Sequence, residues 1–179
     1  MANYTKDEIK KTFLKLLDER PLNKISVKDV VSSCGINRNS FYYHFEDIPS
    51  LIDELMTDEA DKVIRKYASS GSFLECYDAV MTFLRRKRRT IMHVYRYVDR
   101  ATFDNYTVKS CRYFVNGYAE AALVGRSIPD DQLELIKKTF TFLLVGIMLD
   151  WLEHGMNEDD LPEMRRIIEN GMILLPQVT

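Results

Sequence analysis

The sequence lacks the features that mark a secreted, disulfide-bonded or membrane-spanning chain. Its three cysteines, Cys34, Cys76 and Cys111, include no CxxC pair, so reduced thiols in a cytosolic protein are expected. The longest apolar run, Phe140 to Leu149, stops at Asp150 and is too short for a membrane span of about 20 residues. The N-terminus has no apolar signal core. We therefore expect a cytoplasmic protein with no membrane partner.

The sequence also lacks the short motifs of common catalytic and metal sites. His44, His93 and His154 are far apart, without the HExxH spacing of a zinc site. No Gly-rich phosphate loop, GxSxG elbow or Cys-His motif occurs. We therefore expect no enzyme, no metal site and no cofactor.

What is present is enough apolar material for a core, together with an uneven distribution of charge. Hydrophobic residues make up 46% of the 179 residues, which is too many for a disordered chain. Residues 1–45 hold eight Lys or Arg and five Asp or Glu, a net charge of +3, whereas residues 46–179 carry −5. A basic head on an acidic body is compatible with an N-terminal nucleic-acid module.

Helical signals run along nearly the whole chain, and strand signals are almost absent. Thr5 and Glu8 form a capping-box pattern, and Pro21 should end the helix that follows. Breaks are expected at 68–72, 125–129 and 154–157. Helices are expected over residues 5–20, 26–34, 38–45, 48–67, 73–88, 90–100, 103–124, 130–153 and 161–174. The pattern predicts an all-α protein of about nine helices.

Residues 26–45 predict two short helices joined by a tight turn. Ser26 and Asn37 are suited to cap the two helices, and Gly35 fits the left-handed position that closes the first. Two helices connected in this way indicate a helix-turn-helix, whose second helix enters the major groove of DNA.

The second of these helices has the side chains that base and phosphate contacts require. Arg38 can bond a guanine edge or a phosphate, and Asn39 can pair with adenine. Phe41 and Phe45, four residues apart, should face inward. Further polar contacts would come from Ser40, Tyr42, Tyr43 and His44. Periodicity by itself fits a surface helix of a bundle equally well.

The segment KISVKDVVSSCGINRNSFYYHFEDIPSLIDEL, residues 24–55, resembles the N-terminal domain of TetR/AcrR-type bacterial transcriptional regulators. The resemblance rests on Gly35-Ile36 followed by Phe41-Tyr42-Tyr43-His44-Phe45. It implies a three-helix DNA-binding head at residues 1–47 and a helical ligand-binding and dimerisation body at 48–179, with the fourth helix as the link. The residues that it implies for DNA are Ser26 and Lys28 on the backbone, and Arg38, Asn39, Ser40, Tyr42, Tyr43 and His44 in the groove.

One position departs from the family pattern. Relatives commonly carry a Lys just after the His-Phe pair, whereas this chain has Glu46-Asp47. Two acids near a phosphate path should weaken DNA binding.

The last two helices look like the pair through which the family dimerises. The apolar residues predicted for that interface are Phe140, Leu144, Ile147, Met148 and Trp151, and Gly146 would let another backbone approach. A helix buried within a single chain is the alternative. The basic run Arg85 to Arg89 is expected to be a solvated helix end, with a second nucleic-acid patch as the alternative.

Aromatic residues in the middle of the chain fit either a small-molecule pocket or ordinary core. Candidate ligand residues are His93, Tyr97, Tyr113 and Asn116, and an apolar or aromatic effector is expected. The function predicted is a homodimeric, ligand-responsive repressor that releases a double-stranded DNA operator. The alternatives are an all-α coactivator or interaction partner that does not bind DNA, and a helical small-molecule carrier.

Overall fold

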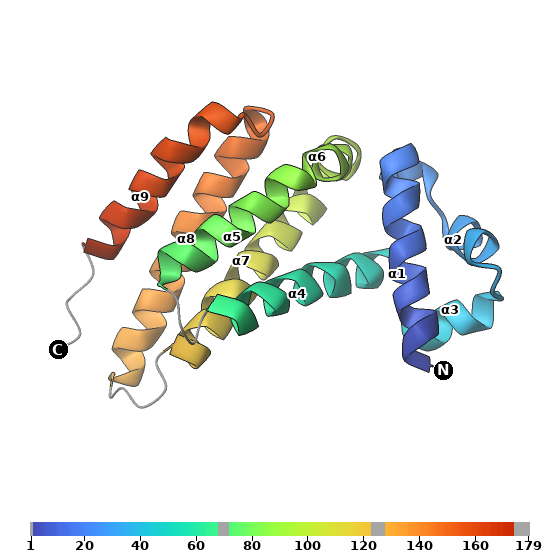
Figure 1. Ribbon diagram of the computed structural model, residues 1–179, viewed down its shortest axis with the longest axis horizontal. Helices are drawn as coiled ribbons and strands as arrows, with labels where there is room; N and C mark the ends of the chain where they lie inside the picture. Colours follow the sequence, from blue (N-terminus) through green and yellow to red (C-terminus); the bar gives the residue numbers. More distant parts are fainter. Residues whose placement is uncertain (1, 68–71, 123–127, 174–179) are drawn as a thin grey trace. The chain divides into compact units, whose positions relative to one another are not determined.

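The structure, a computed structural model, describes residues 2–67, 72–122 and 128–173. Within these ranges it contains helices and no strand, so the predicted all-α class is confirmed (Figure 1). The helices are α1 (Ala2–Glu19), η1 (Leu22–Lys24), α2 (Val27–Cys34), α3 (Arg38–His44), α4 (Ile48–Tyr67), α5 (Phe73–Arg86), α6 (Arg88–Tyr97), α7 (Arg100–Ala122), α8 (Asp130–Glu153), η2 (Glu158–Asp160) and α9 (Leu161–Ile173). The predicted breaks at 68–72 and 125–129 and the predicted helix ends at Val124 and Leu174 fall wholly or partly outside the described residues.

Three predicted helix starts are wrong: those of the first helix, of α6, which begins at Arg88 rather than Thr90, and of α7. The first helix begins at Ala2, so Thr5 lies inside it and is not its cap; a capping residue must stand outside the helix with non-helical backbone. The helix α7 begins at Arg100 rather than Phe103, because the Asp99 carboxylate accepts a hydrogen bond from the Thr102 N–H at 2.9 Å and so caps the earlier start.

The chain folds into two compact units. The first contains Met1–Met56 together with Lys87–Phe103, and the second contains Thr57–Arg86 together with Asp104–Thr179. The helix α4 therefore belongs to both units, and α6 belongs to the first. These two compact units do not coincide with the two functional domains predicted to meet at residue 47. The functional boundary stays a prediction.

In the first unit, α1 packs against α2, α3 and α6. Its central apolar residues Ile9 and Phe13 are completely buried. At the end of α1, the Thr90 hydroxyl of α6 donates to Asp18 Oδ1 at 2.5 Å, and His93 Nδ1 lies 3.2 Å from the Leu17 carbonyl oxygen. Polar contacts as well as apolar burial therefore fix α6 to α1.

The start of α4 is joined to α1 by a carboxylate with two ammonium partners. Glu54 Oε1 lies 2.5 Å from Lys6 Nζ and 2.7 Å from Lys10 Nζ. Burial raises the pKa of Glu54, but the hydrogen bonds from Lys10 and Lys6 outweigh it, so the pKa is lowered overall. The ionised carboxylate is therefore the form that the first unit favours.

The second unit has an aromatic core centred on Phe73 at the start of α5. The Phe73 ring lies 5.9 Å from Phe114, 5.1 Å from Tyr118 and 4.9 Å from Phe140, measured between ring centroids. Such tilted and edge-to-face pairs add to the burial of apolar area. Aromatic residues of α7 thus serve the core here, one of the two roles that their sequence left open.

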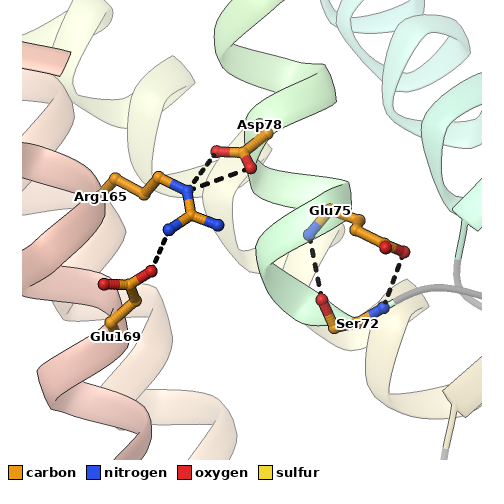
Figure 2. Close-up of polar contacts among 5 residues, drawn as sticks. All are labelled: Ser72, Glu75, Asp78, Arg165 and Glu169. Carbon is orange, nitrogen blue, oxygen red and sulfur yellow. Dashed lines mark hydrogen bonds and ion pairs between the residues drawn. The ribbon is translucent and has the colours of Figure 1, made fainter. Parts of the chain in front are cut away.

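The helix α9 runs alongside α8 in Figure 1 and also packs on α5. Figure 2 shows Arg165 of α9 between two acids: its Nε lies 3.2 Å from Asp78 of α5, and its Nη1 bonds Glu169 on its own helix. Figure 2 also shows the reciprocal bonds of Ser72 and Glu75 that cap α5, at 3.1 and 3.3 Å.

All three cysteines are free. Cys76 and Cys111 are buried, and burial raises the pKa of the Cys76 thiol to about 11 and that of Cys111 to about 12. Thiols with such pKa values are unreactive structural residues. None of the helices in the described ranges combines the length and the apolar character needed to cross a membrane.

Candidate nucleic-acid interface

Three caps fix the helix-turn-helix. Ser26 and Asp29 form a full capping box at α2: the Asp29 N–H donates to Ser26 Oγ at 3.3 Å, and Asp29 Oδ2 accepts from the Ser26 N–H at 2.9 Å. Gly35 closes α2 with a φ of 69°, and Asn37 caps α3 through the Ser40 N–H at 2.8 Å. These contacts confirm the predicted roles of Ser26, Gly35 and Asn37 as caps and set the turn between the two helices.

The helix α3 has one buried side and one exposed side. Phe41 and Phe45 are 0% and 3% exposed, and their ring centroids lie 5.7 Å apart. Tyr42 and Tyr43 are 54% and 78% exposed. A short helix held from behind by two buried rings can present its other side to a partner as a rigid surface.

Of the eight residues predicted to contact DNA, six are exposed: Ser26, Lys28, Arg38, Asn39, Tyr42 and Tyr43. Three of the eight, Ser26, Ser40 and His44, are already engaged within the chain. The Ser26 hydroxyl bonds Asp29, the Ser40 hydroxyl donates to Asn37 Oδ1 at 3.1 Å, and the half-buried His44 ring meets the Tyr43 ring edge-on at 4.9 Å. For Ser26 and Ser40 these bonds restrict the hydroxyl to acceptor contacts or to a rearranged cap.

The two acids after α3 have different roles. Asp47 caps α4, because its Oδ1 accepts a hydrogen bond from the Ser50 N–H at 2.7 Å. Glu46 is exposed, and within the described residues it has no hydrogen bond or ion pair. Of these two acids, Asp47 therefore has a structural role and Glu46 has none.

The four candidate ligand residues do not form a single group. His93 and Tyr97 belong to the first unit, and Tyr113 and Asn116 belong to the second. His93 contacts α1 as described above, and Tyr97 is 48% exposed. The Tyr113 hydroxyl donates to Asp61 Oδ1 of α4 at 2.6 Å, and this bond raises the pKa of the phenol. The Tyr97 ring lies edge-on to the His93 ring at 6.5 Å between centroids. Three of the four thus have partners within the chain, and the role of all four in ligand binding stays a prediction.

A groove lies between α7 and α8. Of its lining residues, only Asn116 was predicted as a candidate ligand residue. Its volume is about 370 Å³, and its lining includes Arg112 and Asn116 of α7, and Lys137, Lys138 and Phe142 of α8. No pattern in the sequence indicated this groove, because Arg112 is distant in the chain from the two lysines. The groove gathers three cations. The expectation of an apolar or aromatic effector stays a prediction.

The residues predicted for the dimer interface need correction. Phe140, Leu144, Ile147 and Trp151 are at most 7% exposed within one chain, so they form its own core and offer no surface to a second copy. Met148 is half-buried. The exposed large apolar residues on α8 and α9 are instead Leu135, Phe142 and Ile167, at 66%, 67% and 41%. The sequence pattern identified an apolar helix but not which side the chain itself covers.

Comparison with known proteins decides the family. Residues 12–55, from α1 to the start of α4, match the family model described as bacterial regulatory proteins, tetR family. Residues 71–171, from before α5 into α9, match the model described as transcriptional regulator C-terminal region. The chain belongs to the tetR family of transcriptional regulators. As a tetR-family regulator it has a DNA-binding helix-turn-helix, and members of this family bind operator DNA as dimers.

Solved structures share the fold of this tetR-family regulator at low sequence identity. The dihydroxyacetone kinase operon activator DhaS matches with a TM-score of 0.69 and 14% identity over 96% of each chain. A TetR transcriptional regulator from Rhodococcus sp. RHA1 has a TM-score of 0.69 and 16% identity, over 98% of this chain and 100% of that one. A regulator from Streptomyces coelicolor has a TM-score of 0.59 and 15% identity, over 94% and 79%. No curated protein sequence matches.

Proposed function

We propose that this tetR-family regulator is a homodimeric repressor that releases its operator when a small molecule binds its body. The observation that carries the proposal is the division of α3, with Phe41 and Phe45 buried and Arg38, Asn39 and Tyr43 exposed. A recognition helix needs this arrangement to reach base edges while its back stays packed. The residues expected at the DNA are the eight named from the sequence. Such a regulator works in the cytoplasm, where bacterial chromosomal DNA lies, and needs no enzymatic activity of its own.

The exposed sides of α8 and α9 support a homodimer. Leu135, Phe142 and Gly146 share one side of α8, because they are seven and eleven residues apart. A Cβ added at Gly146 would meet nothing within 4 Å, so another backbone can come close there. With Ile167 of α9, these residues can form half of a four-helix interface. A two-fold dimer would place two copies of α3 about 34 Å apart, one turn of DNA.

The helix α4 supports a mechanical link between ligand and operator. Its first half is tied to α1 through Glu54. Its second half is tied to α7 through the Asp61–Tyr113 bond and through Ile64, whose Cδ1 lies 2.6 Å from where a Gly117 Cβ would be. An effector that favours one arrangement of α7 would tilt α4 and change the spacing of the two reading heads.

The test is direct binding to DNA. Fragments bound by the protein are selected from the source genome, and affinity for the best fragment is measured by fluorescence anisotropy. Arg38→Ala should cost about 1–3 kcal/mol if Arg38 contacts a base, and Tyr42→Ala should also weaken binding. Lys15→Ala, an exposed cation on α1, is the matched control. If both α3 variants bind every fragment as tightly as the original protein does, the repressor proposal is wrong.

A second candidate is a coactivator that acts through another regulator. DhaS, which shares the fold, is an operon activator by name, and the unpaired carboxylate of Glu46 faces solvent where the phosphate path would run. This candidate predicts that no genomic fragment is selected by the protein alone. It also predicts that a second bacterial regulator co-purifies with the protein on a promoter fragment.

A further inference from the structure

We propose that Asn39 and Tyr43 are the base-contacting residues of α3, and that they recognise A·T base pairs in the operator. Asn39 binds the edge of an adenine, and Tyr43 contacts the methyl group of a thymine. This assignment rests on the proposed function, which places α3 in the major groove of an operator. It divides the residues of α3 into those that specify the DNA sequence and those that hold the DNA backbone.

The buried ring of Phe41 shows which way α3 faces. Phe41 is completely buried, so its side of the helix is the side that packs into the first unit. Successive residues of an α-helix are turned by about 100°, so residues two positions before and after Phe41 lie about 160° away from it around the helix axis. These two residues are Asn39 and Tyr43. They are therefore the pair that points most directly away from the protein and into a groove that α3 enters.

The exposure of the side chains agrees with this geometry. Tyr43 is 78% exposed, whereas Tyr42, which lies nearer to the buried side of the helix, is 54% exposed. Asn39 is exposed as well, and its amide makes no hydrogen bond within the described residues. By contrast, Asn37 already uses its amide oxygen to cap α3. The amide of Asn39 thus has both its donor and its acceptor available for a base.

The other polar residues of α3 lie on the two flanks of this pair, about 60–100° from Phe41 around the helix axis. Arg38 and Tyr42 share one flank. Ser40 and His44 share the other flank, and both are half-buried. Flanking side chains of a helix in the major groove face the phosphates that border it, and phosphate contacts position a protein without specifying the sequence. We therefore assign the flanking residues to the DNA backbone.

The chemistry of the two central side chains matches A·T pairs. An Asn amide can donate to adenine N7 and accept from the adenine N6 amino group, and the major-groove edge of guanine has two acceptors instead. The apolar ring of Tyr43 suits the thymine methyl group. Residues four apart on a helix are about 5–6 Å apart, and bases along a strand are about 3.4 Å apart. The adenine and the thymine should therefore lie within about two base pairs of each other.

Base analogues test these contacts at single atoms. The genomic fragment that the full-length protein binds best is resynthesised with each adenine in turn replaced by 7-deazaadenine, which lacks the N7 acceptor. Each thymine in turn is replaced by uracil, which lacks only the methyl group. Fluorescence anisotropy measures the affinity. We expect binding to weaken about fivefold or more at one adenine of each half-site, and about threefold at a thymine close to it.

Variants of the protein show which residue makes each contact. With Asn39→Ala, 7-deazaadenine at the sensitive position should cause no further loss of affinity. With Tyr43→Ala, uracil should cause no further loss, whereas Tyr43→Phe, which keeps the ring, should retain the difference between thymine and uracil. Arg38→Gln should weaken binding to all fragments alike and reduce the slope of log affinity against log salt by about 0.9. Lys15→Ala, at an exposed position on α1, is the control and should change none of these values.

Three outcomes would overturn the assignment. No adenine or thymine might respond to its analogue, or both α3 variants might respond as the original protein does. The third is a loss at 7-deazaguanine that disappears in Arg38→Gln, which would make Arg38 the base-contacting residue. In all three cases the original protein still binds its fragment, so the proposed function stands. If no fragment is bound at all, the proposed function and this assignment fail together.

Discussion

The rings of Phe41 and Phe45 lie 5.7 Å apart behind the recognition helix, and both are almost fully buried. One turn of α3 is therefore packed into the first unit while its other side stays in solvent. This separates residues that hold the helix from residues that can contact DNA, so substitutions on the two sides should fail in different ways.

Phe41→Ala should destabilise the protein, whereas Tyr43→Ala should not. Removing a completely buried phenyl ring leaves a cavity and costs about 3–5 kcal/mol, while a side chain that is 78% exposed has little packing to lose. Urea unfolding checks the stability, and fluorescence anisotropy checks the DNA affinity. Tyr43→Ala should weaken operator binding without changing the unfolding midpoint. Equal stability of the two variants would contradict the packing described here.

Glu46→Gln should strengthen DNA binding, and Glu46→Lys should strengthen it further. The carboxylate is exposed and unpaired within the described residues, so its removal relieves repulsion from phosphates without a structural cost. A new lysine–phosphate contact should also steepen the dependence of log affinity on log salt by about 0.9. Anisotropy titrations at several salt concentrations measure both effects. Asp47→Asn is the contrasting variant, because it alters a carboxylate that has a structural role as the cap of α4.

Local chemistry explains which predictions from the sequence are confirmed. Capping by Ser26 and Asn37 and the left-handed turn at Gly35 depend on residues within three positions of each other in the chain. Ser26 and Asp29 also have the spacing of a full capping box, but only the cap at Ser26 was predicted. Thr5 shows the limit of this reasoning, since a matching pattern does not stop a helix from starting earlier.

Tertiary packing explains what the sequence could not supply. The helix α8 is apolar around much of its circumference, so its pattern could not say that Trp151 faces the chain's own core while Phe142 faces solvent. The groove at Arg112 needs α7 and α8 to be placed beside each other. The contact of His93 with α1 joins residues 76 positions apart. No local pattern encodes such neighbours.

The ion pairs of Glu54 predict a loss of stability in acid. The pKa of Glu54 is lowered in the folded state from its ordinary value of 4.5, so its contribution is fully present above that pH. The contribution is lost as the pH falls through the lower folded pKa. Because Glu54 is partly exposed, we expect a contribution of about 1 kcal/mol. Urea unfolding at pH 7 and pH 3 checks this.

Glu54→Gln should remove this part of the pH dependence. The variant should be less stable than the original protein at pH 7 and nearly equal to it at pH 3. Glu59→Gln is the matched control, because Glu59 pairs only with the exposed Lys62 on its own helix among the contacts described here. If Glu54→Gln and Glu59→Gln shift stability equally at both pH values, the link between α1 and α4 does not depend on this carboxylate.

The dimer proposal predicts at which exposed apolar residues a negative charge would separate the two copies. Leu135→Glu and Ile167→Glu place carboxylates on the exposed sides of α8 and α9, where a second copy would have to bury them without a partner. We expect each to shift the protein from dimer to monomer in sedimentation velocity while its helical circular dichroism is kept. Tyr97→Glu, at a 48% exposed position on α6, should leave the dimer intact. Because the two DNA-binding heads must bind together, the monomeric variants should also lose operator affinity. If Leu135→Glu or Ile167→Glu stays dimeric, the interface lies elsewhere.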